Sequence, residues 1–566
     1  MFVMYILYKL FFFAQPTPDS LMTQQLTQVS PHAKDWYRES IIYQVYPRSY
    51  YDTNGDGIGD LPGITAKLDY IASLGVDIVW ISPFFTSPMK DFGYDIADYC
   101  DVDPMFGTLA DFDALIARAH SLGLKIMIDQ VMAHTAEDHP WFKESRASRD
   151  NPKADWYVWS NPKDDGNPPN NWLSVFGGSS WQWDTRRRQY YMHNFLASQP
   201  QLNFHNPQVQ QAHLDALRFW LERGVDGIRL DACNYHFHDQ QLRSNPPATN
   251  RDSITVTDVN PYGMQAHDYD KTRPENLPFL QKLRALLDEY QAISIGEVGS
   301  DDSLATMAEY TAGGDKLHMA YSFNLLVNHL SSHYIRQQVE QFEERVKGGW
   351  ASWSVGNHDV PRVASRWGGP DAPPAFAKLA LAMQLSLKGT PCLYQGDELA
   401  FAEADVPFEL LQDPYGITFW PEFKGRDGCR TPMAWTGDDH GGFTKGAPWL
   451  PVSPQHRERA AAVQENDPAS TLAFTRAFIA WRRTLPQLTR GAISFYDAPE
   501  PVLALRRDLD GERGVIAVFN LGAEPVSFNL PQASGAQQLE GYGLPGTVDN
   551  GVVSLPAFGA WFGYAA

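Results

Sequence analysis

The chain of 566 residues is poor in cysteine, in long apolar runs and in positive charge. Its four cysteines, Cys100, Cys233, Cys392 and Cys429, lack the spacing of metal ligands, which argues against a disulfide framework or a zinc site and predicts reduced thiols. After the first thirty residues no stretch is long and apolar enough to span a membrane. A formal net charge of −21 opposes a nucleic acid or an anionic membrane as partner. These absences predict a small, neutral or cationic ligand.

The chain begins with a short apolar run, MFVMYILYKLFFFAQPTP, which resembles the core of a signal peptide. Only Lys9 interrupts the run, no basic segment precedes it, and Met22 offers a second start. We therefore predict that residues 1–34 are an unfolded or artefactual extension and that the protein is cytoplasmic. The alternative is a signal peptide over Met1 to Ala14 and a periplasmic location.

Three segments repeat one pattern, in which an amphipathic helix ends at a glycine and an apolar run follows. Their sequences are KLDYIASLGVDIVWISP, DALIARAHSLGLKIMIDQ and LDALRFWLERGVDGIRLDA, with the glycines Gly75, Gly123 and Gly224. Five further runs are typical of strands, namely SIIYQVYP, AISIGEV, MAYSFN, WSVGNHD and GTPCLYQGDEL. Eight strands alternating with helices predict an α/β chain built on a (β/α)8 TIM barrel.

Two interruptions of this repeat predict further domains. The interval from Gly123 to Gly224 is about twice that from Gly75 to Gly123 and is rich in Trp and Pro, which predicts an inserted domain after strand three. From about Arg490 short alternating runs predict a C-terminal antiparallel β-sandwich domain. The expected division is barrel 35–132 and 204–488, inserted domain 133–203 and C-terminal β domain 489–566.

The run GIRLDACNY places two charges inside a predicted buried strand. Ile228 and Leu230 alternate with Arg229 and Asp231, so both charges lie on one face of the strand. Because burial of unpaired charge is costly, that face needs a reason. One reason is an internal ion pair. The other is an active site, since the carboxyl ends of barrel strands carry the catalytic residues.

Other predicted strands end in similar residues. Asp129 and His134 follow strand three, Glu297 ends strand five, and His358 and Asp359 end strand seven. Each acid alone could be a surface or paired carboxylate. The barrel topology nevertheless brings these strand ends to one pocket.

Three carboxylates and an arginine match the requirements for splitting a glycosidic bond, which needs one ionised and one protonated carboxyl group. Crowding of carboxylates raises the pKa of one of them, while an arginine keeps another ionised. We therefore expect Asp231, two residues from Arg229, to stay charged and act as nucleophile. Glu297, with apolar neighbours on its strand, is expected to donate the proton.

From about Trp36 to the C-terminus the chain resembles the α-amylase family, glycoside hydrolase family 13, and most closely its bacterial α-glucosidase and oligo-1,6-glucosidase branch. The resemblance rests on IIYQVYPRSY, DGIGDLPGI, SPMKDFGYDIADY, GIRLDA, GEV, GNHD, GTPCLYQGDEL and CRTPMAW, in family order. It implies a retaining, exo-acting α-glucosidase that releases α-glucose from short neutral oligosaccharides and transfers part of it to acceptor hydroxyls. It implies no organic cofactor, and a monomer or homodimer.

The resemblance also implies roles for individual residues. Asp231 is the implied nucleophile, Glu297 the acid/base, and Asp359 the carboxylate that stabilises the transition state. The residues implied to hold the non-reducing-end glucose are Asp91, Tyr94, His134, Arg229, His358 and Arg430. Phe176 and Phe195 match pocket aromatics, with packing in the core of the inserted domain as the alternative.

Two positions depart from the family pattern. The usual QPDLN is QPQLN here, with Gln201 in place of the acid, and Ala133 replaces the usual asparagine before the strand-three histidine. The second change weakens the case for the calcium site of true α-amylases. Neither change touches the catalytic carboxylates.

A structural Ca²⁺ site is expected elsewhere. The stretch DTNGDGIGD alternates oxygen-bearing residues with glycines, as calcium loops do, although no helix precedes it and Gly63 stands where a calcium hand has its terminal glutamate. It resembles the calcium loop of this branch. The implied ligands are Asp52, Asn54, Asp56, Asp60 and the carbonyl of Ile58, and the alternative is a turn without metal.

In this branch the residue after the nucleophile correlates with the glycosidic linkage that is cleaved. Valine at this position correlates with α-1,6 bonds, and small or polar residues correlate with α-1,4 bonds. Ala232 occupies that position, which implies maltose rather than isomaltose as substrate. Alternatives within the family are a dedicated glucosyltransferase, a sucrose hydrolase and a trehalose-forming isomerase. A non-catalytic relative that accompanies amino-acid transporters is a further alternative, but such relatives usually lack the acids that this chain keeps.

Overall fold

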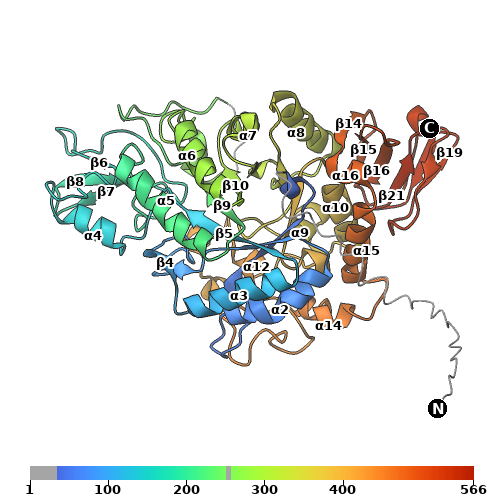
Figure 1. Cartoon of the computed structure of the whole chain (residues 1–566), viewed down its shortest axis with the longest axis horizontal. Helices are drawn as coiled ribbons and strands as arrows, with labels where there is room; N and C mark the ends of the chain where they lie inside the picture. Colours follow the sequence, from blue (N-terminus) through green and yellow to red (C-terminus); the bar gives the residue numbers. More distant parts are fainter. Residues whose placement is uncertain (1–34, 250–255) are drawn as a thin grey trace, which may run out of the picture. The chain divides into compact units, whose positions relative to one another are not determined.

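Eight parallel strands form the central sheet (Figure 1). The computed structural model describes residues 35–249 and 256–566, and the extension or signal peptide predicted for residues 1–34 lies outside them. The strand order is β11-β10-β9-β5-β2-β1-β13-β12, and a parallel bridge between Ala320 and Ala351 joins its two ends. The sheet therefore closes, and the predicted (β/α)8 barrel is confirmed. Its strands are β1 (Ile42–Val45), β2 (Ile78–Ile81), β5 (Lys125–Val131), β9 (Gly227–Asp231), β10 (Ile293–Val298), β11 (Met319–Ser322), β12 (Ser352–Ser354) and β13 (Thr390–Tyr394).

Helices follow the barrel strands along the chain, and local signals set their ends. Thr108 and Asp111 form a capping box at the start of α3. The predicted terminating glycines Gly75, Gly123 and Gly224 have φ of +85°, +78° and +97°, which glycine adopts without strain. The barrel helices are α2 (Leu61–Ser73), α3 (Leu109–Ser121), α5 (Pro207–Glu222), α6 (Asn276–Glu289), α7 (Ser303–Thr311), α8 (Ser332–Arg345), α10 (Pro374–Ser386) and α15 (Thr471–Arg483).

A separate small sheet lies between β5 and α5. It has the order β6-β8-β7, with β6 (Trp159–Ser160), β7 (Trp181–Asp184) and β8 (Gln189–Met192), and α4 (Pro140–Ala147) precedes it. Trp181 of β7 and Met192 of β8 are buried together with Trp172. This is the segment in which the insertion was predicted, and its exact boundaries stay a prediction. A hairpin of β3 (Phe85–Thr86) and β4 (Asp98–Val102) follows β2.

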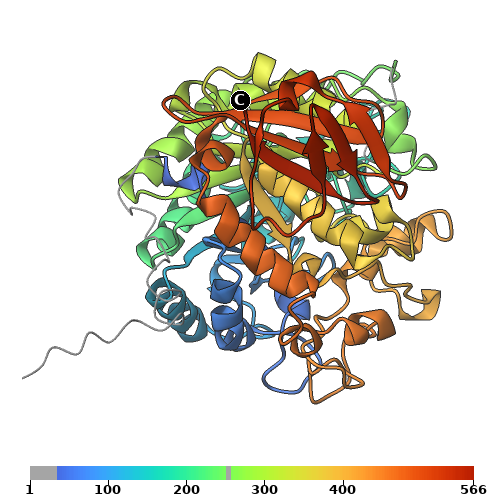
Figure 2. The ribbon, with the colours of Figure 1, turned by 90° about the vertical axis from the view of Figure 1, so that its right-hand side faces the viewer.

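Two antiparallel sheets form the C-terminal part, drawn in red in Figure 2. Val515, Ala517 and Phe519 of β16 belong to the main core of the barrel side, whereas the alternating Ile516 and Val518 pack in the core between the two sheets. The predicted C-terminal β-sandwich is therefore confirmed. The first sheet has β14 (Ala492–Tyr496), β15 (Val502–Asp508), β16 (Val515–Asn520), β21 (Ala560–Tyr564) and β18 (Gln537–Gln538), and the second has β17 (Val526–Asn529), β20 (Val552–Leu555) and β19 (Thr547–Asp549).

Short helices lie along the chain between β12 and the C-terminal sheets. They are α9 (Val363–Gly368), α11 (Pro414–Phe419), α12 (Asp427–Arg430), α13 (Pro454–Glu458), α14 (Ala461–Gln464) and α16 (Pro486–Arg490). In residues 35–249 and 256–566, none of the helices has the length and apolar character needed to cross a membrane.

Candidate active site

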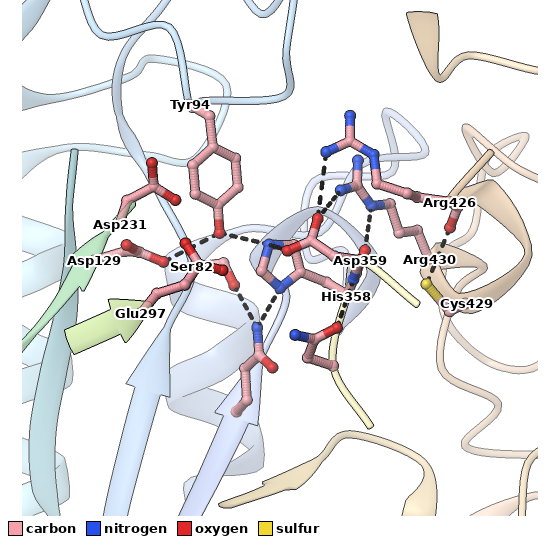
Figure 3. Close-up of polar contacts among 12 residues, drawn as sticks. Ser82, Tyr94, Asp129, Asp231, Glu297, His358, Asp359, Arg426, Cys429 and Arg430 are labelled. Carbon is pink, nitrogen blue, oxygen red and sulfur yellow. Dashed lines mark hydrogen bonds and ion pairs between the residues drawn. The ribbon is translucent and has the colours of Figure 1, made fainter. Parts of the chain in front are cut away.

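The carboxyl ends of four barrel strands bring a cluster of charged residues to one pocket, some on its wall and some behind it (Figure 3). Asp129 lies on β5, Arg229 and Asp231 on β9, Glu297 on β10, and Asp359 follows β12. The register of β5 and β9 pairs Asp129 with Arg229. The topology thus brings together acids that lie far apart in the chain, as the sequence predicted.

The pocket has a volume of about 170 Å³, below the roughly 300–1,000 Å³ of sites for drug-sized ligands, so it favours a small ligand. Nine of the predicted site residues line it. They are Asp91, Tyr94, His134, Phe176, Phe195, Asp231, Ala232, Glu297 and Asp359.

Three other predicted substrate-binding residues, Arg229, His358 and Arg430, lie fully buried behind the pocket wall. His358 Nε2 is 2.6 Å from Tyr94 Oη, and Arg430 Nη2 donates to Asp359 Oδ1 at 3.0 Å (Figure 3). These residues therefore position the lining residues instead of lining the pocket themselves.

Arg229 joins three carboxylates. Its Nη1 lies 2.8 Å from Asp129 Oδ1 and 2.7 Å from Asp231 Oδ1, and its Nη2 lies 2.8 Å from Glu297 Oε1. One guanidinium balances only one of these negative charges, so the cluster favours protonation of one of its acids. The arrangement is therefore more than a simple internal ion pair.

The two candidate catalytic acids share this environment. Burial raises the pKa of Asp231 to about 7, and it also raises the pKa of Glu297 to about 7, in both cases against the attraction of Arg229. Arg229 was expected to act on Asp231, but its guanidinium contacts both acids. Since the two acids interact, they titrate as a pair that keeps one proton near neutral pH. Cleavage of a glycoside by two carboxyl groups needs this charge state.

Asp359 is held ionised by two arginines. Burial acts to raise its pKa, but His358, Arg426 and Arg430 lower it below the ordinary value. Because burial also lowers the pKa of His358, that ring is neutral, and the permanently charged arginines are the effective cause. Nη1 of Arg426 and Nη2 of Arg430 lie 3.2 and 3.0 Å from Asp359 Oδ1.

Arg426 also lines the pocket, although it was not among the residues predicted from the sequence. Its Nη2 lies 2.9 Å from Asp91 Oδ1 and 2.8 Å from Asp413 Oδ1. Arg426 stands one helical turn before Arg430 in GRDGCR, and this spacing was a signal that could have found it.

Both predicted aromatic residues lie on the pocket wall. The ring of Phe176 stacks on Tyr415 with 5.0 Å between centres, and Phe195 lies 5.2 Å from the ring of His134. Both rings therefore form part of the pocket wall, and their contact with a substrate stays a prediction. Further lining residues, which were not predicted, lie in loops and short helices without periodic patterns, namely Val175, Tyr235, Val256, Tyr262, Lys271, Gly299, Phe323, Val360 and Tyr415.

Gln201, the residue that replaces the family's acid, is buried, and both the nitrogen and the oxygen of its amide group form hydrogen bonds. Its Nε2 donates to the carbonyl of Tyr235 at 2.8 Å, and its Oε1 accepts from Asn194 Nδ2 at 2.8 Å. An ionised acid cannot donate to a carbonyl. The glutamine therefore ties the inserted segment to the loop that follows β9.

The predicted calcium loop contains oxygen donors, but many already accept hydrogen bonds. Asp52 accepts backbone N–H groups from Asn54 and Gly57, while Asn54 and Asp56 are exposed. Asp60 instead caps α2 by accepting the N–H of Gly63 at 2.6 Å. Calcium prefers hard oxygen ligands, and the side chains of Asp52, Asn54 and Asp56 offer such oxygens. Asp60 fits the ion less well, because its carboxylate is used as the cap of α2. Over the described ranges, no three or more His, Cys, Asp or Glu side chains are grouped as metal ligands would be.

Comparison with protein families gives a match over residues 44–491 to the model described as alpha-amylase, catalytic domain. A probable alpha-glucosidase of Rhizobium meliloti (strain 1021) is 55% identical over 535 residues, which is 94% of this chain and 97% of that protein. An oligo-1,6-glucosidase of Heyndrickxia coagulans is 37% identical over 557 residues, 91% of this chain and 97% of that protein.

Two solved structures extend this comparison. The alpha-glucosyl transfer enzyme XgtA is 56% identical, with a TM-score of 0.92, and the match covers 94% of this chain and 100% of that one. The trehalulose synthase MutB from Pseudomonas mesoacidophila MX-45 is 33% identical, with a TM-score of 0.85, over 94% of this chain and 99% of that one.

Proposed function

The chain belongs to the α-amylase family, glycoside hydrolase family 13, on its α-glucosidase branch, and from this membership we propose that it releases α-glucose from the non-reducing end of short α-1,4-linked glucosides such as maltose. The observation that carries the proposal is the pairing of Asp231 and Glu297, both with a pKa near 7, in one pocket with an ionised Asp359. Retaining glycosidases need one ionised and one protonated carboxyl group on the same glycosidic bond.

The proposed mechanism has two displacements. Ionised Asp231 attacks the anomeric carbon while Glu297 gives its proton to the leaving oxygen, and a covalent glucosyl-enzyme forms. Glu297, now ionised, then takes a proton from water or from an acceptor hydroxyl, which attacks the anomeric carbon and frees Asp231. Asp359 stays charged and stabilises the positive charge that develops on the sugar ring.

The proposed glucose-binding groups support exo action. Asp91, Arg426 and Asp359 are linked by ion pairs at 2.9 and 3.2 Å and line one pocket, where hydroxyls of a terminal glucose can bind to them. Tyr94 and His134 line the same pocket, and Phe176 and Phe195 offer faces to the C–H groups of the sugar. The small volume favours one end of a short substrate over the interior of a long chain.

A second candidate function is dedicated glucosyl transfer. The likeness to an alpha-glucosyl transfer enzyme at 56% identity over the full length of that chain supports it. Both functions use the same glucosyl-enzyme and differ only in the molecule that attacks it, so acceptor binding determines the balance. The likeness to a trehalulose synthase keeps sucrose among the substrates to be tested.

The proposal is tested by proton NMR of fresh maltose digests, which shows which anomer of glucose appears before mutarotation. We expect α-glucose first. Appearance of β-glucose first would exclude the double displacement, and release from sucrose or trehalose but not from maltose would favour the other family activities. If oligosaccharides accumulate while little free glucose forms, transfer is the main activity.

We also propose that the loop Asp52–Asp60 holds a structural Ca²⁺, with Asp52, Asn54, Asp56 and the carbonyl of Ile58 as ligands and Asp60 at its end. The ion adds no step to the reaction. Chelation should lower the unfolding temperature, and added Ca²⁺ should restore it. Unchanged stability together with an absence of bound metal in the purified protein would exclude the site.

The cytoplasmic location and the monomeric or dimeric state stay predictions. Cys100, Cys233, Cys392 and Cys429 are all free, which is compatible with a reducing compartment. Cell fractionation and analytical ultracentrifugation measure the two properties directly.

A further inference from the structure

A lysine that the proposed mechanism does not use lies in the wall of the catalytic pocket. Lys271 is only 4% exposed and lines the pocket. Its Nζ donates to Tyr262 Oη at 2.7 Å and to Tyr235 Oη at 3.2 Å, and the two hydroxyl groups lie 2.9 Å apart. The ammonium group is also about 5 Å from the centre of each tyrosine ring. The two tyrosines therefore hold it in place.

Two tyrosine hydroxyls, and not a carboxylate, accept the hydrogen bonds that the structure shows for Lys271. Among the residues that the structure describes, it forms no ion pair, and the adjacent Asp270 is paired with His267 at 2.7 Å. Burial acts to lower the pKa of Lys271, but Tyr235, Asp301 and Asp270 raise it, so the group is a cation at neutral pH. Two of its three N–H groups are used by the tyrosines, and within residues 35–249 and 256–566 no acceptor takes the third, which is left for a ligand. Asp301 and Asp270 act on this buried cation without a direct ion pair, so an acceptor brought by a ligand would stabilise it further.

The position of Lys271 places it on the leaving-group side of the pocket. A second cavity of about 300 Å³ adjoins the catalytic pocket, and Lys271 and Gly299 line both. Asp91 and Arg426, which are proposed to bind the glucose, line the catalytic pocket only. Glu297, two residues before Gly299, must reach the glycosidic oxygen, so the leaving group lies toward the second cavity.

The second cavity has the chemistry of a site for a hydroxylated molecule. Its wall includes Gln265, Ser300, Asp301 and Ser303, whose side chains donate or accept hydrogen bonds. A sugar presents several hydroxyl groups to such a wall.

We propose that Lys271 determines specificity for the leaving group, by donating its remaining N–H to a hydroxyl of the sugar that departs from the glucose, or of the sugar that accepts it in transfer. Tyr235 and Tyr262 are positioning residues that aim the ammonium group. This inference rests on the proposed function, and it adds the class of molecule recognised beyond the scissile bond, a neutral polyhydroxylated leaving group or acceptor.

The test compares two substrates in the Lys271→Met variant. The leaving group of maltose is glucose, whose hydroxyl groups can accept the hydrogen bond from Lys271. The leaving group of α-glucosyl fluoride is fluoride, which has no hydroxyl group. Because a hydrogen bond from a charged donor is lost, we expect kcat/KM for maltose to fall about tenfold to a hundredfold. We expect kcat/KM for α-glucosyl fluoride to fall less than about threefold, since the hydrolysis of this substrate does not use that hydrogen bond. Lys282→Met, an exposed lysine of α6 that lines neither cavity, is the matched control.

Each outcome decides the matter. An equal loss on both substrates makes Lys271 structural and overturns the proposal, as does an unchanged kcat/KM on both. If Lys271→Met does not fold, Tyr262→Phe replaces it, with a selective loss on maltose as the supporting result and an equal loss as the opposing one. A wild-type enzyme that hydrolyses α-glucosyl fluoride but not maltose refutes the proposed substrate separately. In that case a loss of transfer to sugar acceptors in the variant still supports the role of Lys271, and unchanged transfer overturns it.

Discussion

Replacing Asp231 with asparagine should abolish glucose release and yet stabilise the fold above pH 7. Asp231 is one of three carboxylates around Arg229, and it is the proposed nucleophile. Without a nucleophile no glucosyl-enzyme forms, so kcat should fall by at least about 10⁴-fold. The same substitution removes one negative charge from a buried cluster in which three carboxylates share the single positive charge of Arg229.

The size of the stabilisation follows from the pKa. A carboxyl group whose pKa rises from 3.8 to about 7 on folding destabilises the folded state by about 4 kcal/mol above pH 7. Between about pH 4 and pH 7 the folded chain binds more protons than the unfolded chain, so stability falls as the pH rises through this window. Below pH 4 the penalty is absent. Because Asp231 and Glu297 share a proton and the ion pair with Arg229 is also lost, we expect a net gain of roughly 1–3 kcal/mol at pH 8.

The assay is thermal unfolding of the wild type and of Asp231→Asn at pH 4.5 and pH 8, beside glucose release from maltose. For a chain of this size each kcal/mol shifts the unfolding temperature by about 1–2 °C. We expect the variant to unfold at a higher temperature than the wild type at pH 8, and the difference to shrink at pH 4.5. Asp215→Asn, an exposed residue of α5, serves as control. A variant that is less stable by the same amount at both pH values would refute the reasoning.

Three further predictions test other parts of the site. Ala232→Val should raise the ratio of kcat/KM for isomaltose to that for maltose, and an unchanged ratio would contradict the proposed link between this residue and linkage preference. Because Ala232 has φ of +41°, the substitution should also lower the free energy of unfolding by roughly 1–2 kcal/mol. kcat/KM for maltose should decline above about pH 7, because Glu297 loses its proton. The Glu297→Gln variant, measured with α-glucosyl fluoride, should lack this decline. If the variant still shows the decline, another group causes it. Arg426→Met leaves Asp91 and Asp413 buried without their cation, so it should cost about 3–5 kcal/mol in stability and most of the activity, and an unchanged unfolding temperature would contradict the ion-pair argument.

Much of the fold was predictable because its signals are local. Gly75, Gly123 and Gly224 end helices through their positive φ, which is a property of single residues. The β-branched runs after them form strands, and eight such strands in order leave a closed barrel as the simplest parallel arrangement. The C-terminal sandwich was equally visible, since alternation along β16 reflects its two packed faces.

The predictable part of the site lies at the ends of strands. Asp231, Glu297 and Asp359 could be grouped because the barrel brings the carboxyl ends of its strands to one face. Phe176 and Phe195 came only from the family resemblance, and both line the pocket. Arg426, which directly precedes α12, was missed although its spacing from Arg430 was visible, because nothing local shows that it contacts Asp91, which lies far away in the chain.

The sequence by itself determined the order of the elements, the barrel and the acids at its strand ends, because helix caps, strand alternation and strand polarity depend on neighbouring residues. Only the tertiary structure decided how the charges are shared. Arg229 contacts both proposed catalytic acids, Lys271 is held between two tyrosines, and Asp60 caps a helix. The physical reason is that a pKa, an ion pair or a ligand site depends on burial and on the distances between groups that lie far apart in the chain.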